Sequence, residues 1–368
     1  MIEVVEAPSK KEFVLFPWKI YKKHKCWVPP LIKEEIELLD ENKNPFYKHA
    51  KIKLFLAYKD KEVAGRIAAC IDKRHNEYHK DKVGFFGFFE CINDFNVSRA
   101  LLDEASSYLR QQGMDRMRGP VNPSMNDSCG LLIKGFFSPP VFMMPYNPRY
   151  YINLLENYGL KKVKDLYAYY LSTLTKPDER LIRIGEKIKK RFNISLRYFS
   201  KKALKRDVNI IKDIYSQAWK DNWSFVPPTD EEIAYTAKRL KNIVPEKFII
   251  FAEKEGEPCG YSLILPDFNQ ALRVINGKIT VFNFLEFLSA LKKINNCRLI
   301  TLGIIDKYRR LGIDLLLYLE SFKVVEESGY VGGELSWTLE DNLSINKPIE
   351  EKMNAELYKV YRIYEKEI

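Results

Sequence analysis

The chain has 368 residues, of which 46% are hydrophobic and 30% charged, and its formal net charge is +11. The length predicts two domains, and the composition is ordinary for a globular protein. No apolar run approaches the ~18 residues of a membrane span, and the charged start "MIEVVEAPSKKEF" does not resemble a signal peptide. We therefore expect a cytoplasmic protein, whose charge suits nucleic acid, an anionic membrane surface or a polyanionic cofactor.

The first half of the chain contains two recognisable patterns. Residues 54–72, "LFLAYKDKEVAGRIAACID", predict a hairpin of two strands, and residues 150–171 predict a helix followed by a strand. Four histidines lie in the first 80 residues, and only His75 and His79 have helical i, i+4 spacing. They lack a third ligand, so we expect a polar surface turn. Six cysteines without a C-x-x-C pair argue against zinc and disulfides, so no metal is expected.

The second half predicts a longer series of elements. A basic helix over 176–193 comes first. The expected elements that follow are helices 207–221 and 230–242, a strand pair within 247–265, strand 298–305, helix 313–328, strand 331–337, helix 343–353 and strand 356–364. Leu315, Leu316, Leu319, Phe322 and Val325 have the spacing that buries one face of the 313–328 helix. The strand–helix–strand order predicts a parallel strand pair, and the class is mixed α/β.

An internal duplication relates the two halves. The hairpin at 54–72 matches "FIIFAEKEGEPCGYSLILPD" at 248–267, with Gly65 and Gly260 at similar places. The ending at 150–171 matches 346–366, and there Gly159 falls opposite Asn354; both residue types tolerate the left-handed conformation that ends a helix. We expect lobes at 1–172 and 195–368, joined by a basic linker helix at 173–194.

The stretch "TLGIIDKYRRLGID" at 301–314 places Arg309, Arg310 and Gly312 between a strand and a helix. Free backbone N–H groups, the helix dipole and a guanidinium there suit a pyrophosphate, with the glycine allowing close approach. By pattern alone, a basic turn before a helix is an equal alternative.

This stretch resembles the acyl-CoA loop of the GNAT superfamily of N-acyltransferases, whose consensus is Arg/Gln-x-x-Gly-x-Gly/Ala. Arg309 and Gly312 match it, whereas Asp314 departs from its last position. The whole chain is more closely similar to a bacterial family of tandem GNAT-like proteins, through "GPVNPSMNDSCGLL", "NWSFVP", "ELSWTLEDN" and "YKVYRIYEK". An Asp at the position of Asp314 is usual in that family. If Asp314 points outward it caps the helix, and if it points inward it repels the cofactor.

The resemblance implies two GNAT-like lobes in a mixed α/β fold. The second lobe is expected to bind acetyl-CoA or another acyl-CoA in a gap between strands 298–305 and 331–337. The expected cofactor-binding residues are Gly303, Ile304, Ile305, Arg309, Arg310, Leu311, Gly312, Ile313 and Asp314. Glu334 and Glu340 are the candidate general bases, and Asn342 is the candidate cofactor or proton-relay contact or, equally, a helix N-cap.

The first lobe is expected to be degenerate, because "ECINDFNVSRALL" lacks the glycines and arginine of the loop. Asn122, Asn126 and Asp127 are turn residues or a wall of the acceptor site, and Cys129 is expected to be a packed thiol. Aromatic clusters at 84–89, 136–151 and 281–287 predict core packing or, alternatively, an apolar groove for an acyl chain or lipid amine.

The expected function is transfer of an acetyl or longer acyl group from acyl-CoA to an amine. Two alternatives remain: long-chain acyl transfer to a lipid amine, from CoA or an acyl carrier protein, and a non-catalytic ligand-binding protein on this fold. No nucleic-acid partner is expected, and peripheral contact with an anionic membrane stays open, as do the acceptor and the oligomeric state.

Overall fold

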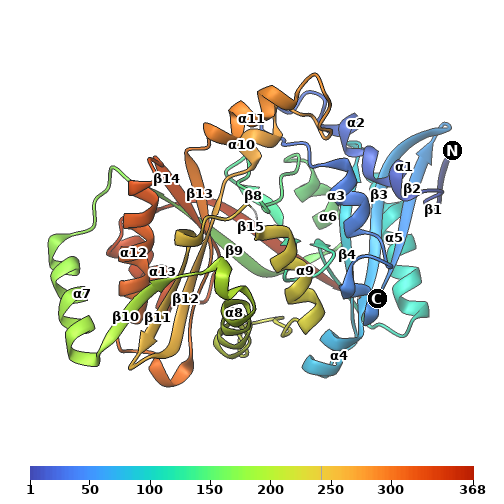
Figure 1. The fold of residues 1–368 in the computed structure, drawn as a ribbon. Coiled ribbons are helices and arrows are strands. Elements are labelled where there is room, and N and C mark those ends of the chain that lie inside the picture. Colours follow the sequence, from blue (N-terminus) through green and yellow to red (C-terminus); the bar gives the residue numbers. More distant parts are fainter. Residues whose placement is uncertain (242) are drawn as a thin grey trace. The chain divides into compact units, whose positions relative to one another are not determined.

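The computed structural model describes residues 1–241 and 243–368, which divide into two compact units (Figure 1). Unit 1 comprises residues 1–167, 269–292 and 359–368, and unit 2 comprises residues 168–268 and 293–358. These units differ from two consecutive lobes in one inserted segment, 269–292, and in the C-terminal residues, which both belong to unit 1.

Unit 1 contains one main mixed sheet with helices. Its elements are β1 (Ile2–Glu6), α1 (Lys10–Leu15), α2 (Pro17–Tyr21), α3 (Ile32–Leu38), β2 (Ala50–Lys59), β3 (Glu62–Asp72), α4 (Lys73–His79), β4 (Val83–Cys91), α5 (Phe95–Gln111), β5 (Arg116–Gly119), β6 (Val121–Asn122), β7 (Ser128–Cys129), β8 (Leu131–Lys134), α6 (Tyr151–Asn157), the start of β9 (Lys161–Ser172), α10 (Asn269–Leu272), α11 (Phe284–Lys292) and the end of β15 (Glu356–Glu367). The strand order is β1-β2-β3-β4-β5-β15-β9, and β4 and β5 are parallel.

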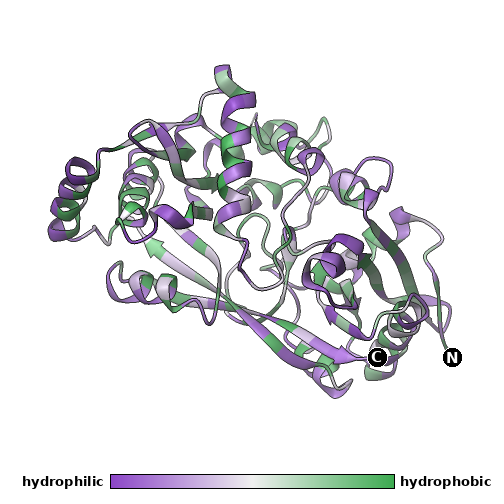
Figure 2. Cartoon of the chain, turned by 90° about the horizontal axis from the view of Figure 1, so that it is seen from below, coloured by the Kyte–Doolittle hydropathy of each residue, from purple (hydrophilic) through white to green (hydrophobic). Residues whose placement is uncertain are grey.

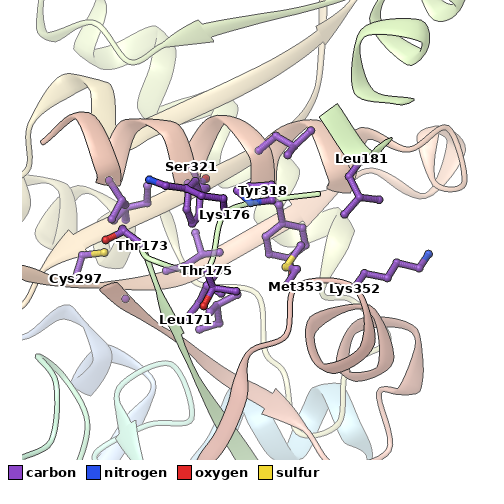
Figure 3. A pocket seen from close by; sticks show the side chains of 18 of the residues that line it. Leu171, Thr173, Thr175, Lys176, Leu181, Cys297, Tyr318, Ser321, Lys352 and Met353 are labelled. Atoms are coloured by element: carbon purple, nitrogen blue, oxygen red, sulfur yellow. The ribbon is translucent and has the colours of Figure 1, made fainter. Parts of the chain in front are cut away.

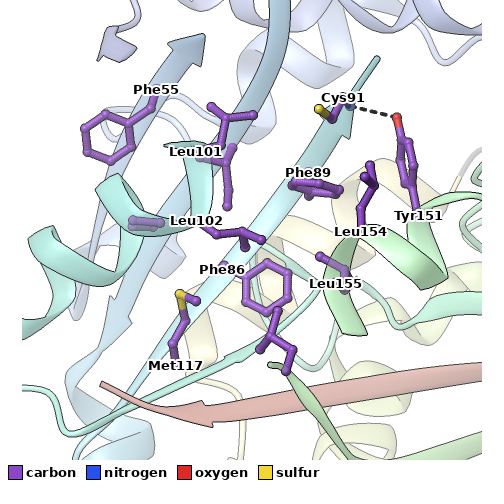
Figure 4. Close-up of a cluster of buried hydrophobic side chains, with 14 of the residues drawn as sticks. Phe55, Phe86, Phe89, Cys91, Leu101, Leu102, Met117, Tyr151, Leu154 and Leu155 are labelled. Atoms are coloured by element: carbon purple, nitrogen blue, oxygen red, sulfur yellow. Dashed lines mark hydrogen bonds between the residues drawn. The ribbon is translucent and has the colours of Figure 1, made fainter. Parts of the chain in front are cut away.

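The core of unit 1 lies between its sheet and α5. Asp94 caps α5, and Val97, Leu101, Ala105 and Leu109 form its buried stripe, because they recur at every fourth residue. Phe86 and Phe89 of β4 pack into the same cluster (Figure 4). The hydroxyl of Tyr151 accepts the backbone N–H of Cys91 at 2.9 Å and donates to Glu90 Oε2 at 2.8 Å.

Unit 2 repeats the arrangement. Its elements are the end of β9, α7 (Glu179–Phe192), β10 (Ile194–Tyr198), α8 (Leu204–Ala218), α9 (Asp230–Leu240), β11 (Ile249–Lys254), β12 (Glu257–Pro266), β13 (Asn296–Ile304), α12 (Ile313–Glu327), β14 (Gly332–Leu339), α13 (Leu343–Glu351) and the start of β15. The strand order is β9-β14-β13-β12-β11-β10, and β13 and β14 are parallel, as predicted. The expected helix 230–242 ends within the described residues at Leu240, and residue 242 lies outside them.

The predicted equivalences between the two halves hold in three dimensions. A Cβ on Gly65 would lie 3.0 Å from the carbonyl oxygen of Glu90, and one on Gly260 would lie 3.0 Å from that of Gly303. Each glycine therefore lets the neighbouring strand approach at the same place in its unit. Gly159 and Asn354 both have positive φ, at 89° and 56°, just after α6 and α13.

The expectation of a polar surface turn at His75 and His79 is wrong for His75. This ring is buried, 4.9 Å from that of Phe85, and burial lowers the pKa of His75 to about 3, so the ring is neutral. No group of His, Cys, Asp and Glu residues among those described is arranged to hold a metal ion. Likewise, no described helix is long and apolar enough to cross a membrane.

Candidate functional site

The site in unit 2 begins where two parallel strands separate. β13 and β14 pair from Asn296 opposite Gly332 to Leu299 opposite Leu335. β13 continues to Ile304 and β14 to Leu339, and beyond Leu299 and Leu335 the described residues of these two strands no longer pair with each other. This fork leaves backbone groups of both strands directed into a gap, which is the place predicted for the thioester arm of acyl-CoA.

The edge of β13 in this gap is set by its pairing with β12. The N–H of Ile305 donates to the carbonyl oxygen of Cys259 at 3.0 Å, and Gly303 pairs with Tyr261. Successive residues of a strand direct their backbone groups to opposite sides, so Ile304 faces the gap and Gly303 and Ile305 face β12. Gly303 has another role, since a Cβ there would lie 2.2 Å from the Trp219 ring at the end of α8.

A buried polar network lies at the base of the fork. Glu334 of β14 is fully buried and accepts hydrogen bonds from the hydroxyls of Ser336 and Tyr358. The guanidinium of Arg298, on the paired residue of β13, donates from Nε to Ser336 Oγ at 2.9 Å. The carboxyl group is thus linked to two hydroxyls and, through one of them, to a buried cation. Such a chain can hold or move a proton.

The loop after β13 has a backbone conformation that would suit an anion. Arg310 and Gly312 are both in the left-handed region, with φ values of 66° and 80°, and α12 begins at Ile313. Left-handed residues next to right-handed or extended ones turn successive N–H groups toward one point, and the α12 dipole adds to the field there. Leu311 is half-buried between these two residues, whereas the Ile313 side chain is fully buried beneath the helix.

The charged side chains of the loop differ in orientation. Asp314 is exposed in the first turn of α12, which agrees with the outward orientation that is compatible with a bound phosphate. Arg309 pairs with Asp306 at 3.0 Å and donates to the carbonyl oxygen of Ala218 at 2.8 Å, which ties the loop to α8. Arg310 is exposed and has no hydrogen bond or ion pair to any described residue, so it is the better placed of the two arginines to meet an anion.

The linker helix α7 packs against α12 and this loop. A Cβ on Gly312 would lie 2.4 Å from Cδ1 of Ile188, and one on Gly185 would lie 3.0 Å from Cδ1 of Leu319. The inner face of α7 is apolar and its outer face is basic, which Figure 2 shows as green and purple sides of the helix. The basic linker is therefore part of unit 2 and borders the candidate phosphate site.

An apolar cavity of about 90 Å³ lies below the fork (Figure 3). Cys297, Leu299 and Leu335 of the paired strands line one side of it, and α12 lines another. The segment from the end of β9 to the first turn of α7 covers it with Leu171, Thr173, Thr175, Lys176 and Leu181. The cavity therefore starts at the last paired residues of β13 and β14, next to the gap.

The predicted α12 stripe borders this cavity. Leu316 and Val325 are buried, as the stripe predicts, whereas Leu315, Leu319 and Phe322 are half-buried and line the cavity together with Val325. The face of α12 that packs closely is formed by Ile313, Leu317 and Val324, which are almost completely buried. Because α12 is apolar on most of its sides, most of its surface must be shielded from water. α7 and the 171–181 segment pack over the sides that the sheet does not cover.

The residues after β14 are placed as a helix start. Asn342 is the N-cap residue of α13, and its Oδ1 accepts a hydrogen bond from Ser344 Oγ at 2.7 Å. The buried asparagine of this region is Asn346, which accepts from Thr338 Oγ1 at 2.6 Å and donates to the carbonyl oxygen of Leu339 at 2.9 Å. Glu340 is half-buried at the end of β14, beyond the fork. The roles predicted for Asn342 and Glu340 stay predictions.

Unit 1 has the same elements but its anion position is filled. The carboxylate of Asp94, the cap of α5, accepts the N–H groups of Asn96 and Val97 and pairs with Lys59 at 2.7 Å. The edge of β4 is also occupied, because Asn122 Oδ1 accepts the N–H of Phe88 at 2.5 Å. Asp127 accepts a bond from Ser124 in the same loop. These contacts agree with the prediction that the first lobe lacks a phosphate loop.

Sequence reasoning missed Arg298, Tyr358 and Asn346. Glu334 and Ser336 share a strand face, which the alternation of side chains indicates. Arg298 joins them only through the register between β13 and β14, and Tyr358 only through the fold, so no local signal identifies either.

No family model matches the chain. It is 33% identical over 365 residues to Protein YghO of Escherichia coli, covering 97% of this chain and 93% of that protein. It is 32% identical over 375 residues to the bacterial ceramide synthase of Caulobacter vibrioides, covering 98% and 96%. Its fold is similar to that of a tandem GNAT protein from the clavulanic acid biosynthesis pathway, with a TM-score of 0.58 at 12% identity over 100% of this chain and 98% of that one.

Proposed function

The chain belongs to the family of Protein YghO and the Caulobacter bacterial ceramide synthase, and it has the tandem GNAT fold; from this premise we propose that it transfers a long acyl chain from an acyl thioester to a lipid amine. The observation that carries the proposal is the apolar cavity beside the fork of β13 and β14. A thioester held in the gap by the free edge of β13 would have its carbonyl near the fork. Its acyl chain would then enter the cavity.

The size of the cavity bears on the acyl group. One water-sized sphere occupies about 10–15 Å³, so a cavity of about 90 Å³ has room for roughly six to nine water-sized spheres. An acetyl group needs far less space than this. Apolar side chains line it on both the strand and the helix side, so a hydrocarbon chain gains free energy by leaving water there. The cofactor we propose is therefore a long-chain acyl-CoA, with an acyl carrier protein as the alternative donor.

The chemistry needs one proton acceptor and one proton donor. The amine nitrogen attacks the thioester carbonyl carbon; a C–N bond forms and the C–S bond breaks. The amine loses a proton and the thiolate gains one. In our proposal Glu334 accepts the proton through the Tyr358 hydroxyl, and the loop from Arg309 to Gly312 holds the pyrophosphate.

Product analysis tests the proposal. The protein is incubated with sphinganine, a long-chain amino alcohol, and with acetyl-CoA, octanoyl-CoA or palmitoyl-CoA, and N-acylated products are identified by mass spectrometry. We expect products from the two longer donors and little from acetyl-CoA. Product from acetyl-CoA alone would refute the long-chain assignment, and CoA binding without any product would favour the non-catalytic alternative.

Leu315→Trp tests the cavity directly. Leu315 is half-buried in the cavity wall, so a larger side chain fills the cavity without overpacking the closely packed face of α12. We expect the palmitoyl-transfer rate to fall at least tenfold while any acetyl transfer is unchanged. Leu343→Trp, on the exposed start of α13, is the control. Equal losses with short and long donors would exclude a chain-length role for the cavity.

Arg310→Glu tests the phosphate loop. A carboxylate at this exposed position replaces a charge-assisted bond worth about 1.5–3 kcal/mol, so CoA affinity should fall roughly 10- to 150-fold. Titration calorimetry of the wild type should also give one CoA per chain, because Asp94 fills the equivalent place in unit 1. Arg110→Glu on α5 should leave the affinity unchanged. Two sites per chain, or equal affinity in Arg310→Glu, would contradict the assignment.

A further inference from the structure

The segment from α10 to α11 is unusual for its exposed apolar side chains. The aromatic cluster at 281–287 was expected to pack in the core or, alternatively, to line an apolar groove; core packing is wrong for Phe282 and Phe284, which are exposed. Val281 is 84% exposed, Phe282 95% and Leu285 76%. Ile279, Phe284 and Leu288 are exposed beside them. These six side chains, which we term the apolar patch, lie within residues 279–288, and their exposure to water costs free energy unless something covers them.

Hydrogen bonds to the rest of unit 1 hold the segment that carries the patch. The N–H of Ile32 donates to the carbonyl oxygen of Gly277 at 3.0 Å, and Trp18 Nε1 donates to Asn276 Oδ1 at 2.9 Å. Asn283 closes the following turn, since it accepts the N–H of Thr280 at 2.7 Å and donates to the carbonyl oxygen of Lys278 at 2.9 Å. These hydrogen bonds hold the backbone before and within the patch in place. The apolar side chains are therefore exposed on an ordered segment.

Basic residues of unit 1 flank the patch in the sequence, and others lie near α10. Lys278 and Lys292 are exposed at its two ends in sequence. The backbone next to α10 adds Lys22, Lys23 and Lys25, all exposed, and Arg273 Nη2 donates to the carbonyl oxygen of Lys25 at 3.2 Å, which brings this run alongside. Figure 1 shows the loop between α10 and α11 beside α2, where Trp18 bonds to Asn276. Glu286 is the one acid between Thr280 and Lys292.

We propose that the apolar patch inserts into the surface of an anionic lipid bilayer, with these lysines contacting the lipid phosphates. Exposed aromatic and aliphatic side chains flanked by lysines are the combination that binds at such an interface, because apolar burial and attraction to anionic headgroups add. The proposal goes beyond acyl transfer and does not depend on it, since the patch belongs to unit 1 and its composition alone recruits the lipid.

A second copy of the chain is a less suitable occupant of the patch. In a symmetric dimer the same surface meets itself, so the lysines near one patch would face the lysines near the other. Like charges brought together in this way oppose association. An anionic bilayer instead offers a hydrocarbon interior that can bury the apolar side chains and negative headgroups that attract the lysines.

Vesicle flotation measures the proposed contact. The full chain is mixed with vesicles of phosphatidylcholine alone or of equal parts phosphatidylcholine and phosphatidylglycerol. We expect binding to the anionic vesicles, weakened by salt, and little binding to the neutral ones. The double variant Phe282→Ser/Leu285→Ser should reduce partitioning at least tenfold, and Lys22→Glu/Lys23→Glu should reduce it only for anionic vesicles. All these side chains are exposed, so folding should be unaffected, which circular dichroism verifies.

Tyr78→Ser is the matched control, because it removes an aromatic ring that is 45% exposed on α4, at the other end of unit 1 in Figure 1. It should bind vesicles like the wild type. Equal partitioning of Phe282→Ser/Leu285→Ser and the wild type would overturn the proposal. So would a dimer, seen by light scattering, that is lost in this double variant while no vesicle binds. Failure of acyl transfer would leave the vesicle result unaffected, so the two proposals fail separately.

Discussion

Glu334→Gln is expected to lower the acyl-transfer turnover number by about 10²- to 10⁴-fold, the range typical of losing a general base. Glutamine keeps the size of the side chain and an oxygen that accepts from Ser336 or Tyr358, but it does not take up a proton. Glu334 lies one residue before the last strand pair, so its hydroxyl partners sit at the base of the fork. CoA affinity should stay close to that of the wild type, because the phosphate loop is unchanged.

Glu340→Gln separates the two candidate bases. Glu340 lies beyond the end of β14 and is half-buried, and we expect its loss to change the turnover number less than that of Glu334. The measurement is the rate of CoA release over a range of pH, with thermal unfolding as a check on folding. If Glu334→Gln retains activity within a factor of three, or if Glu340→Gln is the slower variant, the proton acceptor is not Glu334.

Asp207→Asn is expected to lower the free energy of unfolding by about 3 kcal/mol at neutral pH. Asp207, in the first turn of α8, is fully buried and accepts from Arg197 Nη1 and Nη2 at 3.1 Å each and from the N–H of Ser200 at 2.9 Å. Breaking a buried ion pair costs roughly 3–5 kcal/mol. The lower end applies because the Arg197 side chain is 25% exposed and keeps its bond to Glu253.

The effect depends on pH in a defined direction. Burial opposes the charge of Asp207, but the Ser200 N–H and the Arg206 and Arg197 guanidinium groups outweigh it and hold the pKa of Asp207 below its usual range. A lowered pKa in the folded state means that this stabilisation is complete above the unfolded pKa of about 3.9 and is lost as the pH falls through the folded pKa. The difference between wild type and Asp207→Asn should therefore shrink in acid.

Urea unfolding at several pH values measures this difference. Asp213→Asn, at an exposed position on the same helix, should unfold like the wild type at every pH. A loss in Asp207→Asn no larger than in Asp213→Asn would show that the buried pair contributes no net stability. A loss that persists unchanged below the folded pKa would show that it arises from packing and not from the charge.

The sequence determined the features that depend on neighbours along the chain. The hairpins, the strand–loop–helix around Gly312 and the terminating residues Gly159 and Asn354 were predicted because turn chemistry and hydrophobic periodicity act over a few residues. The exposed position of Asp314 agrees with the outward one of the two stated alternatives, and its orientation toward a bound phosphate stays a prediction. The missing loop of the first lobe was also visible, since it is an absence of specific residue types.

Only the tertiary structure decided which distant residues meet. The end of β15 pairs with β5 in unit 1, yet the alternation of its side chains would suit a strand in either unit. Arg298 reaches Ser336 through a register between strands that no local pattern specifies. Residues of the α12 stripe border a cavity, and apolar residues of α11 face solvent. Apolar periodicity predicts that a helix face is apolar, but it does not predict what lies against that face.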